Sequence, residues 1–150
     1  MSDLRIEAVE GEDALRDWQY VHNTIIPTHV LSLDDVRERV GRNHLEVAYA
    51  DGVLVGCSTV RPPQDDETAT ATVIARVLPG HRGRGFGAAI HERGLERARE
   101  LGARTVETVA WAANEDGLRF AEKHGYAEFE RYLLPGDDVY WIELRRTRGE

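Results

Sequence analysis

The chain has 150 residues, of which 41% are hydrophobic and 31% charged, and its formal net charge at pH 7 is -8. This length and composition predict one globular domain over residues 1–150. The negative total argues against general nucleic-acid binding, and no apolar run has the length of a signal peptide core or a membrane span. We therefore expect a cytoplasmic protein whose partners include neither nucleic acid nor a membrane.

The charges are distributed unevenly along the chain. The segment from Arg76 to Arg104 contains seven arginines and three glutamates and carries +4, so the rest of the chain carries -12. A basic segment suits a phosphorylated ligand, whereas acidic loops at Asp65-Asp66-Glu67 and Asp137-Asp138 suit a cationic second substrate. The single cysteine, Cys57, lies in an apolar stretch and is expected to be a buried structural thiol.

The first forty residues predict a strand and two helices. Alternating apolar and charged residues from Leu4 to Val9 are typical of a half-buried strand. Helical spacing of apolar residues predicts a helix from Glu12 to about Asn23. Residues 25–31 are too apolar for a solvated loop and either line a pocket or, as we prefer, seal the core. A capping box at Ser32 then opens a second helix with two inward-pointing valines, Val36 and Val40.

Three antiparallel strands are expected next. The period of the apolar pattern changes to two over Leu45–Tyr49 and Val53–Val60, and the Asp51-Gly52 pair between them predicts a tight primed turn. Residues 68–78 are rich in Thr, Ala, Val and Ile and predict a third strand of this set.

A glycine turn follows directly. In Leu78-Pro79-Gly80-His81-Arg82-Gly83-Arg84-Gly85-Phe86-Gly87-Ala88-Ala89-Ile90, three glycines at alternate positions lie between a strand-like and a helix-like run. Glycine permits positive φ and close approach of the main chain to a ligand, and N–H groups at a helix N-terminus attract anions. Arg82 and Arg84 add planar cations suited to phosphate oxygens. We interpret this turn as a pyrophosphate cradle.

Two other interpretations of the turn stay open. It could be a tight strand-to-helix connection without a ligand, or a dinucleotide site, because Gly83 to Ala88 fits G-x-G-x-x-A and Glu107 lies at a suitable distance for a ribose. Against the dinucleotide site, Pro79 to Arg82 intervene after the strand, and the preceding segments indicate hairpins rather than a βαβ unit. A Walker loop is excluded because no Gly-Lys-Ser or Gly-Lys-Thr follows.

The second half of the chain predicts a helix, a strand, a helix and a hairpin. The helix from Gly85 to Leu101 should place Gly94 close to a sheet and bury one stripe, composed of Phe86, Ala89, Ile90, Ala98 and Leu101. Residues 105–111 form a strand that the helical crossover makes parallel to 68–78. Asn114 can cap a last helix running to about His124, and 126–133 and 139–146 form the final hairpin.

In this order the elements resemble the GNAT superfamily of acetyl-coenzyme-A-dependent N-acetyltransferases, a mixed α/β fold with an antiparallel N-terminal half and one parallel strand pair. Two segments carry the resemblance. Arg82-Gly83-Arg84-Gly85-Phe86-Gly87 fits the family's Arg/Gln-x-x-Gly-x-Gly/Ala signature, and Asn114 to Tyr126 is similar to its Asn-led helix that ends in Glu-Lys-x-Gly-aromatic.

The resemblance implies a set of residues that bind acetyl-CoA, and it implies no metal. The pyrophosphate would be held by amides of Arg82, Gly83, Arg84, Gly85, Phe86, Gly87 and Ala88. The main chain of Val77 and Leu78 would pair with the pantetheine arm where two parallel strands splay apart, and Asn114 would contact the arm from the other side. The alternatives are ordinary sheet pairing for Val77 and Leu78 and a plain helix cap for Asn114.

Catalysis in the family is direct attack of a neutral amine on the thioester, and here the residues depart from the pattern. Family members commonly place a proton-donating tyrosine in the Asn-led helix, but the matching position is Ala121. Glu107 is the best candidate for the base, although a solvent-facing or ion-paired glutamate is the alternative. The weaker candidates are Tyr126, Tyr132 and His29.

Activity is expected even without the tyrosine. Positioning supplies effective molarities of roughly 10⁵ to 10⁸ M, whereas acid or base help is worth about 10² to 10⁴-fold. The preferred function is an N-acetyltransferase that acts on a primary amine of a small molecule or peptide. A catalytically weak or inactive acyl-CoA-binding module and a dinucleotide-binding module are the alternatives, and a homodimer is compatible with the sequence.

Overall fold

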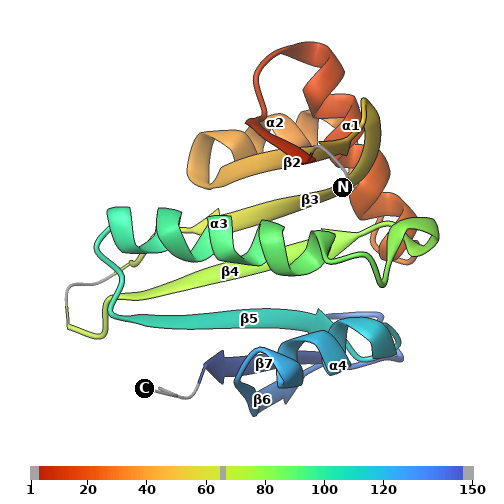
Figure 1. Cartoon of the computed structure of the whole chain (residues 1–150). Coiled ribbons are helices and arrows are strands. Elements are labelled where there is room, and N and C mark those ends of the chain that lie inside the picture. Colours follow the sequence, from red (N-terminus) through yellow and green to blue (C-terminus); the bar gives the residue numbers. More distant parts are fainter. Residues whose placement is uncertain (1–3, 65–66, 147–150) are drawn as a thin grey trace.

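A seven-stranded mixed sheet forms the centre of the molecule, in the order β1-β2-β3-β4-β5-β7-β6 (Figure 1). The computed structural model describes residues 4–64 and 67–146. The strands are β1 (Leu4–Ala8), β2 (His44–Ala50), β3 (Val53–Arg61), β4 (Thr70–Val77), β5 (Thr105–Trp111), β6 (Tyr126–Tyr132) and β7 (Trp141–Arg146). The helices are α1 (Gly11–Ile25), α2 (Leu33–Arg42), α3 (Phe86–Glu100) and α4 (Glu115–Lys123), with a short 3₁₀ turn, η1, at Pro79–His81. No helix within the described ranges is long and apolar enough to cross a membrane.

The strand pairing confirms the mixed α/β fold. Neighbouring strands from β1 to β4 are antiparallel, β4 and β5 are parallel, and β7 lies antiparallel between β5 and β6. Asp51 and Gly52 have φ of 51° and 81°, so both turn residues between β2 and β3 adopt the positive φ that a primed turn requires.

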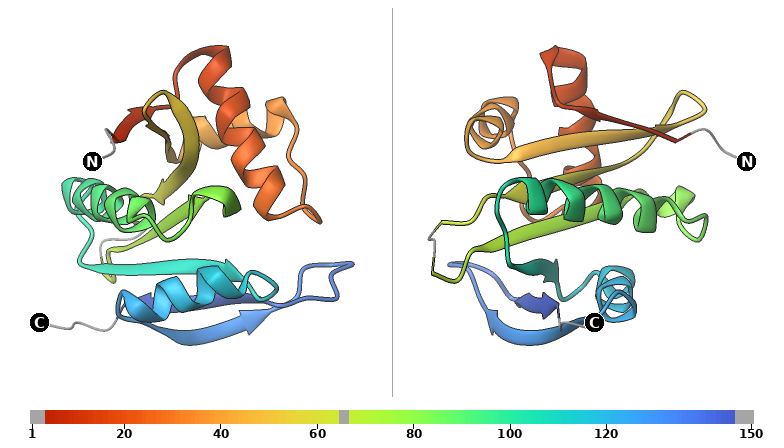
Figure 2. Two further views of the ribbon diagram at one scale, coloured as in Figure 1. Left: turned by 45° about the vertical axis from the view of Figure 1, so that its right-hand side comes forward. Right: turned by 60° about the vertical axis from the view of Figure 1, so that its left-hand side comes forward.

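Helices cover both faces of the sheet, with α1 and α2 on one face and α3 and α4 on the other (Figure 2). The side chains of β4 alternate between the two layers. Ile74 and Leu78 join the apolar core with α1, whereas Ala75 and Val77 pack with Phe86 of α3. The period of two along a strand therefore separates an α1 face from an α3 face within β4.

The segment between α1 and α2 seals the core at its two ends but not in its middle, since Leu31 also packs against the core. Ile25 and Ile26 are 7% and 1% exposed, as expected. Val30 is 65% exposed, so the prediction is wrong for this residue, which lies in a short connection that projects beyond the core.

The capping box at the start of α2 is confirmed. The Ser32 hydroxyl accepts from the Asp35 N–H at 3.1 Å, and the Asp35 carboxylate accepts from the Ser32 N–H at 2.9 Å. Val36 is fully buried, but Val40 is 38% exposed. The expected inward position of Val40 is wrong. Only the first turns of α2 pack against the core, and Val36 in these turns is the one buried residue of the helix.

The buried stripe of α3 differs from the predicted one. Ala89 is exposed and Leu101 is 36% exposed, because the stripe runs through His91 instead. The expected close approach of Gly94 to the sheet is confirmed: a Cβ at this position would lie 2.6 Å from Val73 Cγ1. Any larger residue there would push α3 away from β4.

Candidate functional site

The parallel strands β4 and β5 pair over only part of their length. Their register runs from Thr70 opposite Thr105 to Thr72 opposite Glu107, although β4 continues to Val77 and β5 to Trp111. The two strands therefore diverge beyond Glu107. The sheet has a gap at the end where the glycine turn leads into α3, as the resemblance implied.

The glycine turn presents an open helix N-terminus at this gap. Gly83 and Gly85 have φ of 78° and 85°, a conformation that favours glycine, and Gly85 is the residue that precedes α3. No side chain of the described residues caps this end, and the first bond within the helix runs from the Ala89 N–H to the Gly85 carbonyl at 3.2 Å. The three preceding N–H groups of α3 are consequently directed out of the helix end, where an anion can accept from them.

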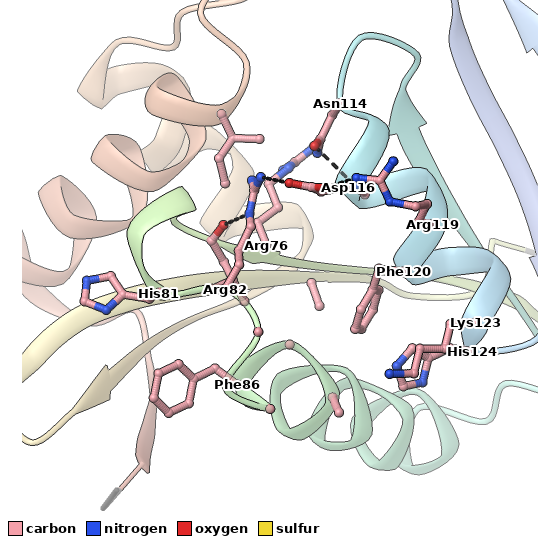
Figure 3. Close-up of a pocket in the computed structure, with 18 residues that line it drawn as sticks. Arg76, His81, Arg82, Phe86, Asn114, Asp116, Arg119, Phe120, Lys123 and His124 are labelled. Atoms are coloured by element: carbon pink, nitrogen blue, oxygen red, sulfur yellow. Dashed lines mark hydrogen bonds and ion pairs between the residues drawn. The ribbon is translucent and has the colours of Figure 1, made fainter.

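A cavity of about 460 Å³ joins the helix end to the gap (Figure 3). It gathers eight of the ten predicted coenzyme-binding residues: Val77, Arg82, Gly83, Gly85, Phe86, Gly87, Ala88 and Asn114. Ile25 of α1 also lines it, so the cavity extends from the α3 face of the sheet to the α1 face.

Arg82 bridges the two walls of the cavity. Its Nε donates to the Val77 carbonyl at 2.9 Å, and its guanidinium forms a 2.8 Å ion pair with Asp116 at the start of α4. Hydrogen bonds from Arg82 and then Arg119 hold the pKa of the Asp116 carboxyl below its usual value. The cation expected for phosphate thus lies at the cavity, between β4 and α4.

Two predicted residues lie outside the cavity lining. Leu78 has both main-chain groups occupied, since its N–H donates to the Val55 carbonyl at 2.8 Å and its carbonyl accepts from the His81 N–H at 2.9 Å. Arg84 lies over the Phe86 ring, with its guanidinium carbon 4.8 Å from the ring centre. Val77, the last residue of β4, lines the cavity and is therefore better placed than Leu78 to contact a bound arm, although its carbonyl accepts from Arg82.

Asn114 faces the gap from the β5 side and also caps α4. Its side-chain oxygen accepts from the Gly117 N–H at 3.2 Å, which confirms the predicted cap. The residue also lines the cavity. Both roles considered for Asn114 are thus compatible with one position.

The lining residues that the sequence analysis missed come mostly from one face of α4. Phe120, Lys123 and His124 point toward α3, and Arg119 lies beside Asp116 (Figure 3). The helical spacing of Asp116, Arg119, Phe120 and Lys123 is a signal that could have identified this face.

Glu107 lies where β4 and β5 separate, but it lines neither this cavity nor the smaller one beside it. Its side chain is 17% exposed, and the nearest cation is Arg145, at 3.8 Å. Burial, and then the neighbouring Glu143, raises the pKa of Glu107 against the opposing effects of Arg145 and Arg61. The side chain shares the α1 face of β5 with Val109, two residues further along.

The weaker candidates for proton transfer have structural partners. The Tyr126 hydroxyl lies 2.8 Å from Nε2 of the buried His91, and the His29 ring is bound to Asp137 at 2.6 Å. Tyr132 packs against the core on the α1 face, and its pKa is raised by burial and then by Glu143. Cys57 is 1% exposed, and burial raises its pKa to about 12, as expected for a structural thiol.

Of the acidic residues expected to suit a cationic second substrate, Asp137 already has partners within the protein. Asp137 already accepts from the Trp141 indole at 3.0 Å and contacts His29. Burial raises the pKa of this carboxyl, but the hydrogen bonds from His29 and Trp141 outweigh burial and hold it below its usual value. Asp65 and Asp66 lie outside the described residues.

Comparison with known proteins identifies the family. Residues 11–126 match the model of the acetyltransferase (GNAT) family. The chain therefore belongs to this family, whose acyl donor is acetyl-CoA. No curated protein gives a significant match.

Solved structures with the same fold cover nearly the whole chain. One, assigned provisionally as a phosphinothricin N-acetyltransferase, is 22% identical with a TM-score of 0.78, over 99% of this chain and 100% of that one. Naa50 of Arabidopsis thaliana, in complex with a bisubstrate analogue, is 16% identical with a TM-score of 0.76, over 96% and 98%. The ribosomal-protein-alanine N-acetyltransferase of Brucella melitensis is 18% identical with a TM-score of 0.71, over 95% and 98%.

These comparisons bear on the alternatives. The family match, together with the antiparallel strands before the glycine turn, argues against the dinucleotide-binding module. Within the described part of the chain, no group of three or more His, Cys, Asp or Glu side chains could hold a metal ion.

Proposed function

We propose that the protein is an N-acetyltransferase that moves an acetyl group from acetyl-CoA to a primary amine by direct attack. The observation that carries the proposal is the gap between β4 and β5, which opens into a cavity at the uncapped N-terminus of α3. In this arrangement a thioester can enter from the α3 face and meet an amine from the α1 face.

The coenzyme is proposed to lie along the cavity with its phosphates on the α3 side. The amides from Arg82 to Ala88 would bind the pyrophosphate, with the guanidinium of Arg82 in the lining and that of Arg84 over the neighbouring Phe86 ring. Lys123 and Arg119 on α4 would meet further phosphate oxygens. Val77 and Asn114 would contact the pantetheine arm from the two sides of the gap.

The chemistry would proceed in one displacement. The amine nitrogen forms a bond to the thioester carbonyl carbon, the carbon–sulfur bond breaks, the amine gives up a proton, and the thiolate takes one. Holding the reactants together supplies most of the acceleration, because a thiol leaves readily with an ordinary pKa of about 8.5.

Water is proposed to replace the missing tyrosine. Ala121, Asn114 and Tyr126 line a second cavity of about 30 Å³ beside the gap, which has room for about one water molecule. Such a water could protonate the thiolate. On the α1 face, Glu107 is proposed to receive the amine proton through another water, because its side chain does not reach the cavity itself.

A second candidate function is an acyl-CoA-binding module with little or no turnover, and the alanine at position 121 favours it. An amine panel with thiol detection distinguishes the two. Acetyl-CoA, but not NAD, should raise the free energy of unfolding, by about 2.7 kcal/mol at a hundredfold excess over Kd. Release of CoA with an amine supports the transferase, and stabilisation without release from any amine supports the binding module.

A further inference from the structure

Arg76 points to the side of the sheet opposite the proposed phosphate site. The neighbouring β4 residues Ala75 and Val77 pack with α3, so the alternation along the strand places Arg76 on the α1 face. Its register partner on β3, Cys57, belongs to the core on that same face. Arg76 still lines the large cavity, so its side chain is exposed to the gap from the α1 side.

Among the residues that the structure describes, no carboxylate compensates this guanidinium. Arg82 and Arg119, which line the same cavity, both pair with Asp116. The guanidinium of Arg76 makes no hydrogen bond or ion pair with any residue in the described ranges 4–64 and 67–146. Burial is the largest effect and lowers the pKa of Arg76; the Cys57 thiol opposes it, and the nearby cations Arg61 and Arg39 lower the pKa further. A half-buried cation among cations is unfavourable unless an anion binds there.

The proposed pose of the coenzyme leaves Arg76 without an anion. The pyrophosphate would lie at the glycine turn on the α3 face, and the pantetheine arm that passes the gap has no charge. The second substrate approaches from the α1 face. An acid group on that substrate is therefore the partner that this site lacks.

We propose that Arg76 binds an acid group of the acceptor, and that the acceptor is a small amine that also carries a carboxylate, as an amino acid does. This inference rests on the proposed function and specifies its substrate class. It differs from the cationic acceptor that the acidic loops suggested, because the acceptor proposed here also carries a negative charge. Arginine suits the role because its planar fork can hold both carboxylate oxygens.

The loops that border this face favour a small acceptor over a polypeptide. His29, between α1 and α2, is joined to Asp137, between β6 and β7, by the 2.6 Å contact, and the Trp141 indole donates to the same carboxylate. The two connections lie on the same side of the molecule (Figure 2). Their link restricts the space through which an extended chain could pass.

The experiment compares matched acceptors in matched variants. The kcat/KM for common L-amino acids and for their carboxamides is measured for the unmodified protein and for Arg76→Met, Arg76→Lys and Arg99→Met. The unmodified protein should prefer the acids, although a carboxylate lowers the neutral fraction of the neighbouring amine. Arg76→Met should lower kcat/KM for the acids by about 10- to 100-fold and leave the carboxamides nearly unchanged.

The controls separate an acceptor contact from other roles. Arg76→Lys should retain part of the preference, and Arg99→Met, on the exposed surface of α3, should retain all of it. Arg76→Met should melt at the same temperature or higher, because it removes an unpaired half-buried charge. An equal loss for acids and carboxamides would overturn the proposal, since a contact with the coenzyme affects both alike.

A binding measurement tests the acid site even if the protein acetylates none of the amines. The same compounds are titrated into the CoA complex of each protein by calorimetry. If no amine is acetylated, the proposed function fails, but tighter binding of acids than carboxamides that disappears in Arg76→Met still supports the acid site. Equal binding of the two sets by the unmodified protein would overturn the acid site even if acetylation occurs.

Discussion

Thr72 and Glu107 are the last residues that pair β4 with β5, and beyond them the two strands separate. Five residues of β4 lie beyond this pair, from Val73 to Val77, so their main-chain groups on that side have no neighbouring strand to bond with. A ligand with amide groups can fill this space as a strand would. Glu107 lies at the point of separation, although its side chain does not line the cavity.

The glycine turn can be tested with a pair of valine variants. Gly85→Val and Gly102→Val both place a β-branched residue at a φ near +85° to +90°, where a Cβ meets nothing within 4 Å. Both should lower the free energy of unfolding by about 1–3 kcal/mol. Only Gly85→Val should also weaken acetyl-CoA binding, by about tenfold or more, because its side chain fills the cavity. Calorimetry gives the affinities, and equal affinities in the two variants would refute the cradle.

The two roles of Asn114 can be separated by side-chain length. Asn114→Ala should cost about 0.5–2 kcal/mol of stability through the lost cap and should raise the KM for acetyl-CoA. Asn114→Ser keeps a capping oxygen but is too short to reach the gap. It should therefore restore the stability without restoring the KM. If Asn114→Ser restored both the stability and the KM for acetyl-CoA, Asn114 would affect the coenzyme only by capping α4 and not by a contact of its own.

A base at position 107 predicts a specific pH profile. Its pKa is raised by burial and then by Glu143, so the acid limb of kcat should lie above the ordinary range of a glutamate. Glu107→Gln should abolish this limb and lower kcat by about 10² to 10⁴-fold. Glu143→Gln removes a neighbouring negative charge and should move the limb to lower pH. A limb that is unchanged in both variants would exclude Glu107 as the base.

Two buried histidines predict loss of stability in acid. Burial, and then Arg76, lowers the pKa of His22 from 6.5 to about 4, and burial, and then His124, lowers that of His91 to about 4. Between pH 6.5 and 4 the unfolded chain binds protons that the folded chain does not, so the free energy of unfolding should fall as the pH falls. Denaturant unfolding across this range measures the slope, which should be smaller in the His22→Gln/His91→Gln variant. A flat profile for the unmodified protein would contradict these shifts.

The order of the elements could be predicted because each one has a strong local signal. Ser32 and Asn114 are caps with fixed spacing, Asp51-Gly52 permits one kind of turn, and the glycines before α3 require positive φ. Caps and turns depend only on residues close together in the sequence, and the structure confirms these predicted caps and turns. Val40 and Ala89 were misplaced because packing between elements decides their exposure.

The site itself was only partly predictable. The pyrophosphate cradle is continuous in sequence, so its residues could be named in advance. The divergence of β4 and β5 depends on how two strands distant in the sequence twist relative to each other. A short sequence motif cannot predict it. In the sequence, Arg76 is one of seven arginines in a basic segment. The sheet places it on the face opposite the glycine turn, where no carboxylate of the described residues lies near it.

Amide hydrogen exchange, measured by NMR with and without saturating acetyl-CoA, tests the central claim most directly. If the coenzyme lies in the gap with its pyrophosphate at the glycine turn, the N–H groups of Phe86, Gly87, Ala88 and Val77 should exchange more slowly in the complex. The N–H groups of the Asp51-Gly52 turn should be unaffected. Binding of acetyl-CoA with no protection at these four residues would contradict the account.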